Sequence, residues 1–194
     1  NIRMQKWVGA TGSKNQAVLP GEVVTFYLDF QVSDVSAFTD VVITDILGDG
    51  LEYVAGSARI VSYDRRGADS VSGDFAADNV QVSEPDGNGS TTLRLDVSAQ
   101  LTALQPGLEV LLGACVPDDF GGLEVACLAG GTAPTVGQIS YQARVLNEYR
   151  ETKGSGSDHV VQNDHIDNEA TIRGKIVNVV TGVETELYDS DPGA

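Results

Sequence analysis

Two stretches of this sequence decide its fold: Gly-Glu-Val-Val-Thr-Phe-Tyr-Leu-Asp-Phe-Gln-Val-Ser at residues 21–33, and Val-Val-Ile-Thr-Asp-Ile-Leu at residues 41–47. Apolar and polar side chains alternate along the first stretch, which is typical of a strand that buries one face. In the second stretch, Val41 and Ile43 share a face with Asp45. We therefore expect two strands facing one core. The Asp45 carboxylate ends a buried row, where it needs a partner.

Short alternating runs recur along the chain, separated by turn signals such as Pro-Asp-Gly-Asn-Gly at residues 85–89. Many short strands of this kind predict an all-β fold, an antiparallel β-sandwich, and no helix of convincing length appears. We expect residues 101–104 to form a helical turn or a bend, and residues 64–78 to form a mobile insertion. The further strands are expected at 2–8, 51–54, 57–63, 80–82, 93–97, 108–116, 122–128, 139–145, 168–180 and 183–188. One sandwich module is expected over residues 1–188, with a linker to a following domain over residues 189–194.

The composition limits the partners of the chain. Its 194 residues are 41% apolar, and 12 Lys and Arg stand against 28 Asp and Glu, a net charge of −16. Because phosphate binding needs basic patches, nucleic acid is excluded as a partner. No apolar run has membrane-spanning length, so no membrane insertion is expected within this segment.

The acidity serves solubility first, but it also suits Ca²⁺. Oxygen ligands are available at Asp86/Asn88, Asp118/Asp119, Asp164/Asp167 and Asp189/Asp191. None of these pairs lies in an EF-hand loop pattern, so each is more often a turn than a calcium site, and no cofactor is firmly predicted. His159 and His165 lie in an acidic stretch whose spacing matches no zinc motif.

The two cysteines, Cys115 and Cys127, have no CxxC pair or Cys/His cluster around them, which argues against zinc. They flank an eleven-residue segment that is typical of a hairpin tip. Two readings are open, a disulfide that closes this loop or two buried thiols. We favour the disulfide, which would imply an oxidising compartment.

Three motifs carry a resemblance to known families: Leu-Pro-Gly-Glu-Val-Val-Thr-Phe at 19–26, Val-Val-Ile-Thr-Asp-Ile-Leu-Gly-Asp-Gly-Leu at 41–51 and Asn-Glu-Ala-Thr-Ile at 168–172. Their order resembles the conserved-repeat domains of bacterial surface proteins and the isopeptide-forming domains of pilins and adhesins, which share an immunoglobulin-like plan. The resemblance covers about residues 1–54 and 138–181. It implies an immunoglobulin-like β-sandwich with loop insertions and an extracellular, cell-surface location. Gly48 departs from the pattern, because these families usually have a proline there.

In such domains a lysine of the first strand joins an asparagine of the last strand in a spontaneous amide bond, assisted by an acid. By position, the resemblance implies Lys6 as the amine, Asn168 as the acceptor and Asp45 as the assisting acid. Burial lowers the pKa of a lysine and raises that of an aspartate, so Lys6 becomes nucleophilic and a protonated Asp45 polarises the Asn168 carboxamide. The alternative is a buried Lys6–Asp45 ion pair with Asn168 as a hydrogen-bond partner.

The function expected from these residues is mechanical: a stalk or filament module that contacts neighbouring domains of its own chain. The rival is an adhesin module that binds a glycan or a protein through the insertions at 64–78, 113–135 and 150–166. No motif of an enzyme acting on an external substrate is present.

Overall fold

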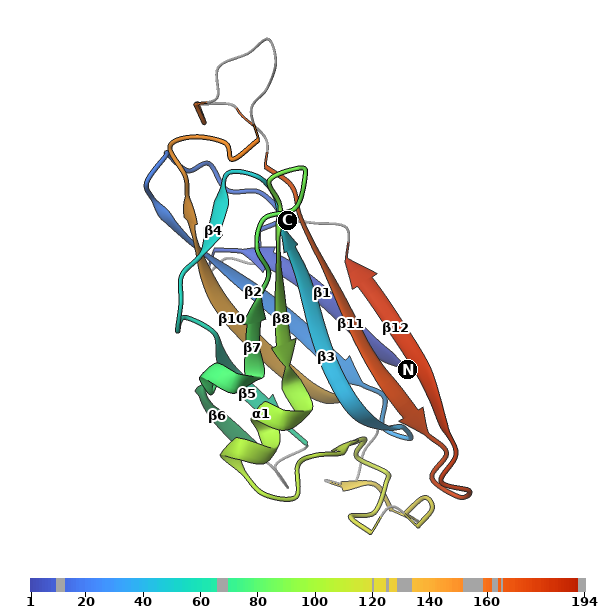
Figure 1. Ribbon diagram of the computed structural model, residues 1–194. Helices are drawn as coiled ribbons and strands as arrows, with labels where there is room; N and C mark the ends of the chain where they lie inside the picture. The colour runs from blue at the N-terminus through green and yellow to red at the C-terminus, as the bar shows by residue number, and fades with distance from the viewer. Residues whose placement is uncertain are drawn as a thin grey trace.

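The computed structural model describes residues 1–9, 13–65, 70–119, 121–124, 126–128, 134–151, 159–161, 164 and 166–191. Within these residues the chain forms two antiparallel sheets that face each other as a sandwich (Figure 1). The first sheet has the order β1-β2-β10-β5-β6, with β4 also paired to β10; the second has the order β12-β11-β3-β8-β7, with β9 also paired to β3. The predicted all-β sandwich is therefore confirmed. The bounds of the elements are β1 Ile2–Val8, β2 Val23–Val32, β3 Ala37–Leu47, β4 Leu51–Tyr53, β5 Arg59–Asp64, β6 Ser70–Asp74, η1 Ala77–Asn79, β7 Val80–Val82, β8 Thr91–Asp96, α1 Val97–Leu104, β9 Leu111–Leu112, β10 Thr135–Val145, β11 Asn168–Val177 and β12 Glu184–Asp191.

The alternation in the sequence becomes the alternation of buried and exposed side chains in the long strands. In β2, every second side chain from Val24 to Val32 is buried, and β10 and β11 follow the same pattern. The inner faces of both sheets form one apolar cluster, which includes Phe26, Ile43 and Ile172. Polar side chains that fall in these rows are therefore placed inside the core, whatever their chemistry.

One expected irregular region is regular. The stretch 64–78, predicted as an insertion, contains β6 and η1, apart from residues 66–69, which lie outside the described residues. It is ordered by Gln100 of α1, whose side chain accepts from Ala76 N at 2.8 Å and donates to Asp74 O at 2.9 Å.

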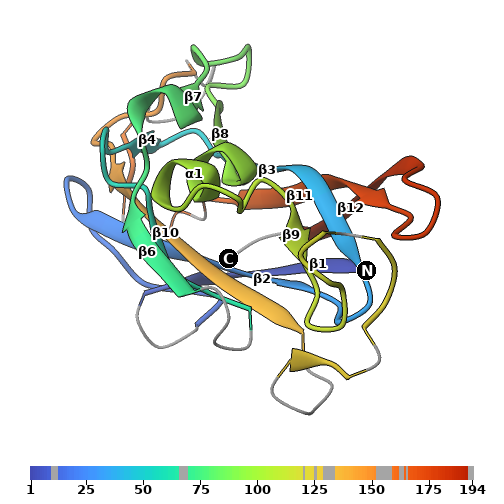
Figure 2. The same cartoon turned by 90° about the horizontal axis from the view of Figure 1, so that it is seen from below.

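Helix α1 itself extends the helical turn that was expected over residues 101–104. It begins after Asp96, whose side chain caps Ala99 N at 3.1 Å. The helix contacts β3 of one sheet and β6 of the other, as Figure 2 shows from below. The sequence signal for this helix is an N-cap residue, Asp96, followed by a short apolar segment, and the search for alternating strands did not detect it.

The strands predicted at 108–116 and 122–128 are wrong for the described residues. Among the residues described there, β9 is the only strand, and the chain beyond it bonds to the β2–β3 connection, with Gly113 N donating to Ser36 O and Cys115 N to Asp34 O, both at 2.7 Å. Among the described residues, the two segments exchange two backbone hydrogen bonds, from Glu124 N to Cys115 O at 2.8 Å and from Leu128 N to Ala114 O at 2.9 Å, which do not make a strand ladder.

Strand β12 runs to Asp191 and so includes residues that the sequence assigned to a linker; residues 192–194 lie outside the described residues. Its carboxylates serve the open edge of β1, because Asp189 accepts from Met4 N and Asp191 from Lys6 N, each at 2.9 Å. Along this edge the two sheets are therefore joined by hydrogen bonds from the β1 backbone to the β12 carboxylates, and not by a ladder of backbone hydrogen bonds.

Candidate functional site

Lys6 is the charged residue that β1 places inside the sandwich. It lies between Met4 and Val8 in the inward row and is 0% exposed. Its Nζ donates to Asp45 Oδ1 at 2.6 Å and to Oδ2 at 2.7 Å. The ammonium also lies 4.8 Å from the centroid of the Phe26 ring, within cation–π range.

Asp45 is connected to Asn168 through Tyr141. The Tyr141 hydroxyl donates to Asp45 Oδ2 at 2.8 Å, and Asn168 Nδ2 donates to the Tyr141 oxygen at 3.0 Å. Asp45 and Tyr141 are fully buried and Asn168 is 1% exposed. Lys6, Asp45, Tyr141 and Asn168 therefore form one continuous hydrogen-bonded chain in the core, which we call the core cluster.

Strand register brings these residues together from four strands. In the second sheet, β11 pairs with β3 so that Ala170 lies opposite Asp45, and Asn168 is the next inward residue of β11. In the first sheet, β2 separates β1 from β10, and Leu28 of β2 pairs with Lys6 on one side. Tyr141 lies on β10, the strand on the other side of β2, and faces the same core.

One side-chain atom of Asn168, its buried Oδ1, has no hydrogen bond within the described part of the chain. An unsatisfied buried carbonyl oxygen is costly and calls for an explanation.

Burial shifts the pKa values of the cluster toward neutral forms. The pKa of Lys6 lies below its usual value because of burial, opposed by the charge of Asp45. The pKa of Asp45 is raised by burial, opposed by the charge of Lys6. Compared with water, the site favours a neutral amine beside a neutral acid, which is the state in which a lysine is nucleophilic.

The structure brings Lys6, Asp45 and Asn168 together, and it adds Tyr141, which the sequence placed only in the alternating strand expected at 139–145. The available signal was that a buried tyrosine hydroxyl usually finds a hydrogen-bond partner. Alternation alone does not say which one.

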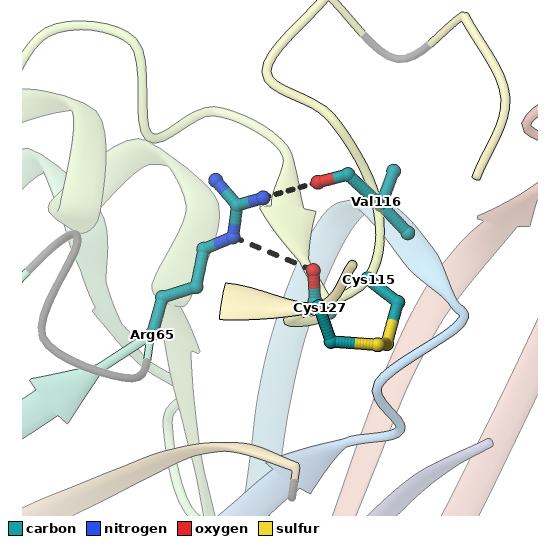
Figure 3. Close-up of a disulfide and its surroundings, with 5 residues drawn as sticks. Arg65, Cys115, Val116 and Cys127 are labelled. Atoms are coloured by element: carbon teal, nitrogen blue, oxygen red, sulfur yellow. Dashed lines mark hydrogen bonds between the residues drawn. A yellow bond between two sulfur atoms is a disulfide. The ribbon is translucent and has the colours of Figure 1, made fainter. Parts of the chain in front are cut away.

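The second predicted site, the cysteine pair, is joined: Cys115 and Cys127 form a disulfide (Figure 3). Beside it lies Arg65, which is 2% exposed. Its Nη2 donates to Val116 O, its Nε to Gly113 O at 3.4 Å and its Nη1 to Asp118 Oδ1 at 2.6 Å. Arg65 thus fixes the cysteine loop to the end of β5.

The acidic residues proposed for calcium have other partners. Asp86 Oδ1 accepts from Asn88 N at 2.8 Å, as in a turn, and Asp118 binds Arg65. No group of three or more potential metal-ligating side chains occurs in the described ranges. His159 lies 3.5 Å from Glu148, while His165 falls outside the described residues, and the calcium prediction stays a prediction.

Of the three insertions predicted for ligand binding, two are largely described by the structure and one is not. Most of 64–78 is regular structure, as noted above, and the described part of 113–135 is the cysteine loop held by Arg65. Much of 150–166 lies outside the described residues.

No family model matches the chain, and no curated protein matches it. Among solved structures it is similar to a variant of BcpA, the major pilin subunit of Bacillus cereus (TM-score 0.46, 14% identity, covering 97% of this chain and 38% of that one). It is also similar to the pilus backbone RrgB of Streptococcus pneumoniae (0.47, 12%, covering 90% and 31%) and to ACE19, the collagen-binding subdomain of the Enterococcus faecalis surface protein ACE (0.41, 13%, covering 96% and 94%). The chain thus spans about a third of the length of the two pilins. These are proteins of the group that the sequence motifs resemble.

In the described part of the chain, no helix is both long and apolar enough to cross a bilayer.

Proposed function

We propose that this domain is a structural module of a bacterial cell-surface protein, and that it locks its own core with an amide bond between Lys6 Nζ and Asn168 Cγ. The observation that carries the proposal is the core cluster. A lysine, a carboxyl group and a carboxamide are buried in one hydrogen-bonded chain, and the carboxamide oxygen is unsatisfied within the described residues.

In the proposed reaction, Asp45 takes a proton from the Lys6 ammonium, and the neutral amine attacks Asn168 Cγ. The new bond is Nζ–Cγ, the bond that breaks is Cγ–Nδ2, and one ammonia is released. No external reactant is needed. The reaction is specific to the folded state, because only burial favours a neutral Lys6 beside a neutral Asp45.

The surface location is supported by the disulfide, since disulfides persist in oxidising compartments, and by the sequence motifs. A stalk gains from a covalent bond between its first strand and a late one, because tension then passes through that bond. Labelling of intact producing cells with an antibody to this domain tests the location; signal only after lysis would contradict it.

Intact mass of the denatured, reduced full chain tests the bond. The wild type should be lighter than its sequence mass by one ammonia, and a digest should contain a peptide pair joined through Lys6 and Asn168. Asp45→Ala and Asn168→Ala should have their full sequence masses. Lys175→Ala, which removes a lysine from the surface, should still lose ammonia. A wild-type chain at full sequence mass would leave a buried Lys6–Asp45 ion pair as the correct interpretation.

A further inference from the structure

We propose that Tyr141 is a catalytic residue of this bond-forming reaction, which carries the proton of Asp45 to the departing nitrogen of Asn168. The inference rests on the proposed Lys6–Asn168 bond and assigns a step that this proposal leaves open: how the nitrogen leaves as ammonia.

The step needs a proton donor inside the core. After the Lys6 amine adds to Asn168 Cγ, the Cγ–Nδ2 bond breaks readily only if Nδ2 gains a proton, because an amide anion is a poor leaving group. Asn168 is 1% exposed, so bulk water does not reach it directly. The Tyr141 oxygen lies 3.0 Å from Nδ2 and accepts the only hydrogen bond that this nitrogen makes within the described residues.

The two hydrogen bonds of Tyr141 serve the reaction once the donor and the acceptor in each have exchanged roles. Before the reaction, Nδ2 donates to Tyr141 and Tyr141 donates to Asp45 Oδ2, over 3.0 and 2.8 Å. A carboxamide nitrogen has no free lone pair, but the nitrogen of the tetrahedral intermediate has one and accepts. Asp45, now protonated, donates to the Tyr141 oxygen as Tyr141 passes its own proton to Nδ2.

Protons and bonds balance in this scheme. The Lys6 ammonium gives one proton to Asp45, and the neutral amine forms the Nζ–Cγ bond. Asp45 sends its proton through Tyr141 to Nδ2, and it takes back the proton that Nζ loses on becoming an amide nitrogen. The products are one secondary amide, one ammonia and a neutral Asp45.

Tyr141 is suited to relay a proton without ionising. Burial, followed by the negative charge of Asp45, raises the pKa of the Tyr141 hydroxyl well above its usual value. A phenolate would therefore be a costly intermediate, and the transfer in and the transfer out occur together.

Its position is fixed by packing. The Tyr141 ring stacks on Phe26, with centroids 5.3 Å apart, and lies at a tilt to Tyr53 at 6.3 Å. Strand β10 is paired on both edges, to β2 and to β5. The hydroxyl is thus held between Asp45 and Asn168 by a rigid part of the sheet, as general acid catalysis requires.

The test measures the rate of bond formation in the full chain. Protein is made in a cell-free reaction, samples are quenched in denaturant at intervals, and the linked fraction is read from intact mass. Tyr141→Phe should form the bond at least ~100-fold more slowly than the wild type, which is in the range of general acid catalysis. Tyr63→Phe, which removes a hydroxyl from another buried tyrosine of the same sheet, should link at the wild-type rate.

A pH series separates proton transfer from a structural role. Acid depresses the reactivity of Lys6 equally in both proteins. In Tyr141→Phe, however, the missing hydroxyl leaves a polar space between Asp45 and Nδ2 that a water molecule can fill, and this water delivers a proton to Nδ2 more readily as the pH falls. The ratio of wild-type to variant rates should therefore shrink as the pH falls. An equal ratio at every pH, or a Tyr141→Phe chain that links as fast as the wild type, would overturn the role of Tyr141 and leave the bond intact.

If Tyr141→Phe does not fold, the wild type alone decides. A relay moves two protons in one step, so the rate should depend on the deuterium content of the solvent along a curve, whereas a linear dependence would mean a single proton and overturn the relay. A wild-type chain that never loses ammonia contradicts the bond itself, an outcome distinct from both of these.

Discussion

At the scale of the residue, the unusual feature is a lysine and an aspartate buried together at 2.6 Å in an apolar core. Burial penalises both charges, and their attraction offsets only part of that penalty. A buried ion pair is weak evidence for stabilisation, because well-packed apolar residues of similar volume often make a fold equally stable. The arrangement is better explained by chemistry that needs these groups dry and adjacent.

The burial of the Lys6–Asp45 pair predicts a pH dependence of stability that holds whether or not the Lys6–Asn168 bond forms. In Lys6→Met, Asp45 loses the charge that holds its pKa down, so burial alone raises it further. A carboxyl group with a raised pKa in the folded state contributes stability below its unfolded value of 3.8, and this is lost as the pH rises through the folded value. Near neutral pH, Lys6→Met should be less stable to urea by ~3–5 kcal/mol than Asn168→Ala, which is equally unlinked but keeps the pair.

The control is the double variant Lys6→Met/Asp45→Asn, which has no carboxyl group to titrate at this position. At neutral pH the double variant should recover most of the stability that Lys6→Met loses. Between acid and neutral pH its stability should fall no more than that of Asn168→Ala. Parallel stability curves for the single and double variants would mean that Asp45 ionises at no cost in the core, contrary to this account.

Residues also mark where sequence reasoning stops. Lys6, Asp45 and Asn168 were identified because each is polar in an apolar row or lies in a motif. Tyr141 fits an apolar row without conflict, and its partners are 96 and 27 residues away along the chain. Arg65 lies in a polar stretch, and its burial depends on carbonyl groups of a loop about 50 residues further along, which no local pattern reveals.

At the scale of the element, the turn after β3 is built onto the start of β11. Gly48 N donates to Asp167 O at 3.1 Å, next to Asn168. A Cβ on Gly48 would lie 2.3 Å from that same oxygen. This contact explains why the chain has Gly48 where the families that it resembles usually have a proline. A proline there would have no N–H to donate and no space for its ring.

Gly48→Ala should therefore disturb the core cluster from outside it. The backbone at Asp167 must move to admit the methyl group, at a cost of ~1–3 kcal/mol in stability. Because a shift of about 1 Å at a reacting group can reduce a rate by about 100-fold, the bond should also form more slowly. Gly87→Ala, where a Cβ meets nothing within 4 Å, is the control for both measurements. Unchanged rates of ammonia loss in Gly48→Ala would show that this turn does not position Asn168.

The elements predicted from the sequence are those with long alternation, namely β1, β2, β3, β8, β10 and β11, and also the shorter strands β4, β5 and β7 and most of β12. Strand β6 and the cysteine loop were predicted wrongly, for physical reasons. Strand β6 has small polar side chains, Ser-Val-Ser-Gly-Asp, and is ordered by pairing with β5 and by Gln100 of α1. The cysteine loop has strand-like composition, but the backbone N–H groups of Gly113 and Cys115 donate to the β2–β3 connection instead of to a partner strand. Both outcomes depend on tertiary contacts that periodicity does not contain.

At the scale of the whole molecule, the proposed bond encloses most of the fold. It joins residue 6 to residue 168, a separation of 168 − 6 = 162 residues. Treated like a disulfide over a loop of this length, the loss of unfolded-state entropy corresponds to roughly 5 kcal/mol. The Cys115–Cys127 disulfide lies inside that loop and spans only 12 residues, so it stabilises the cysteine loop and adds no second path for tension.

Force applied to the two ends should therefore bypass most of the sandwich. In the linked chain, tension entering β1 crosses from Lys6 to Asn168 and leaves through β11 and β12, and the strands between are not extended. In Asp45→Ala, the same pull should unravel the enclosed residues and lengthen the chain by about 550 Å, at ~3.4 Å per residue. Single-molecule pulling under reducing conditions measures this difference directly. Lys175→Ala, which keeps the core cluster, should behave as the wild type does. A wild-type domain that lengthens as far as Asp45→Ala would show that its first and late strands are not covalently joined, and that whatever mechanical strength it has comes from the sheets alone.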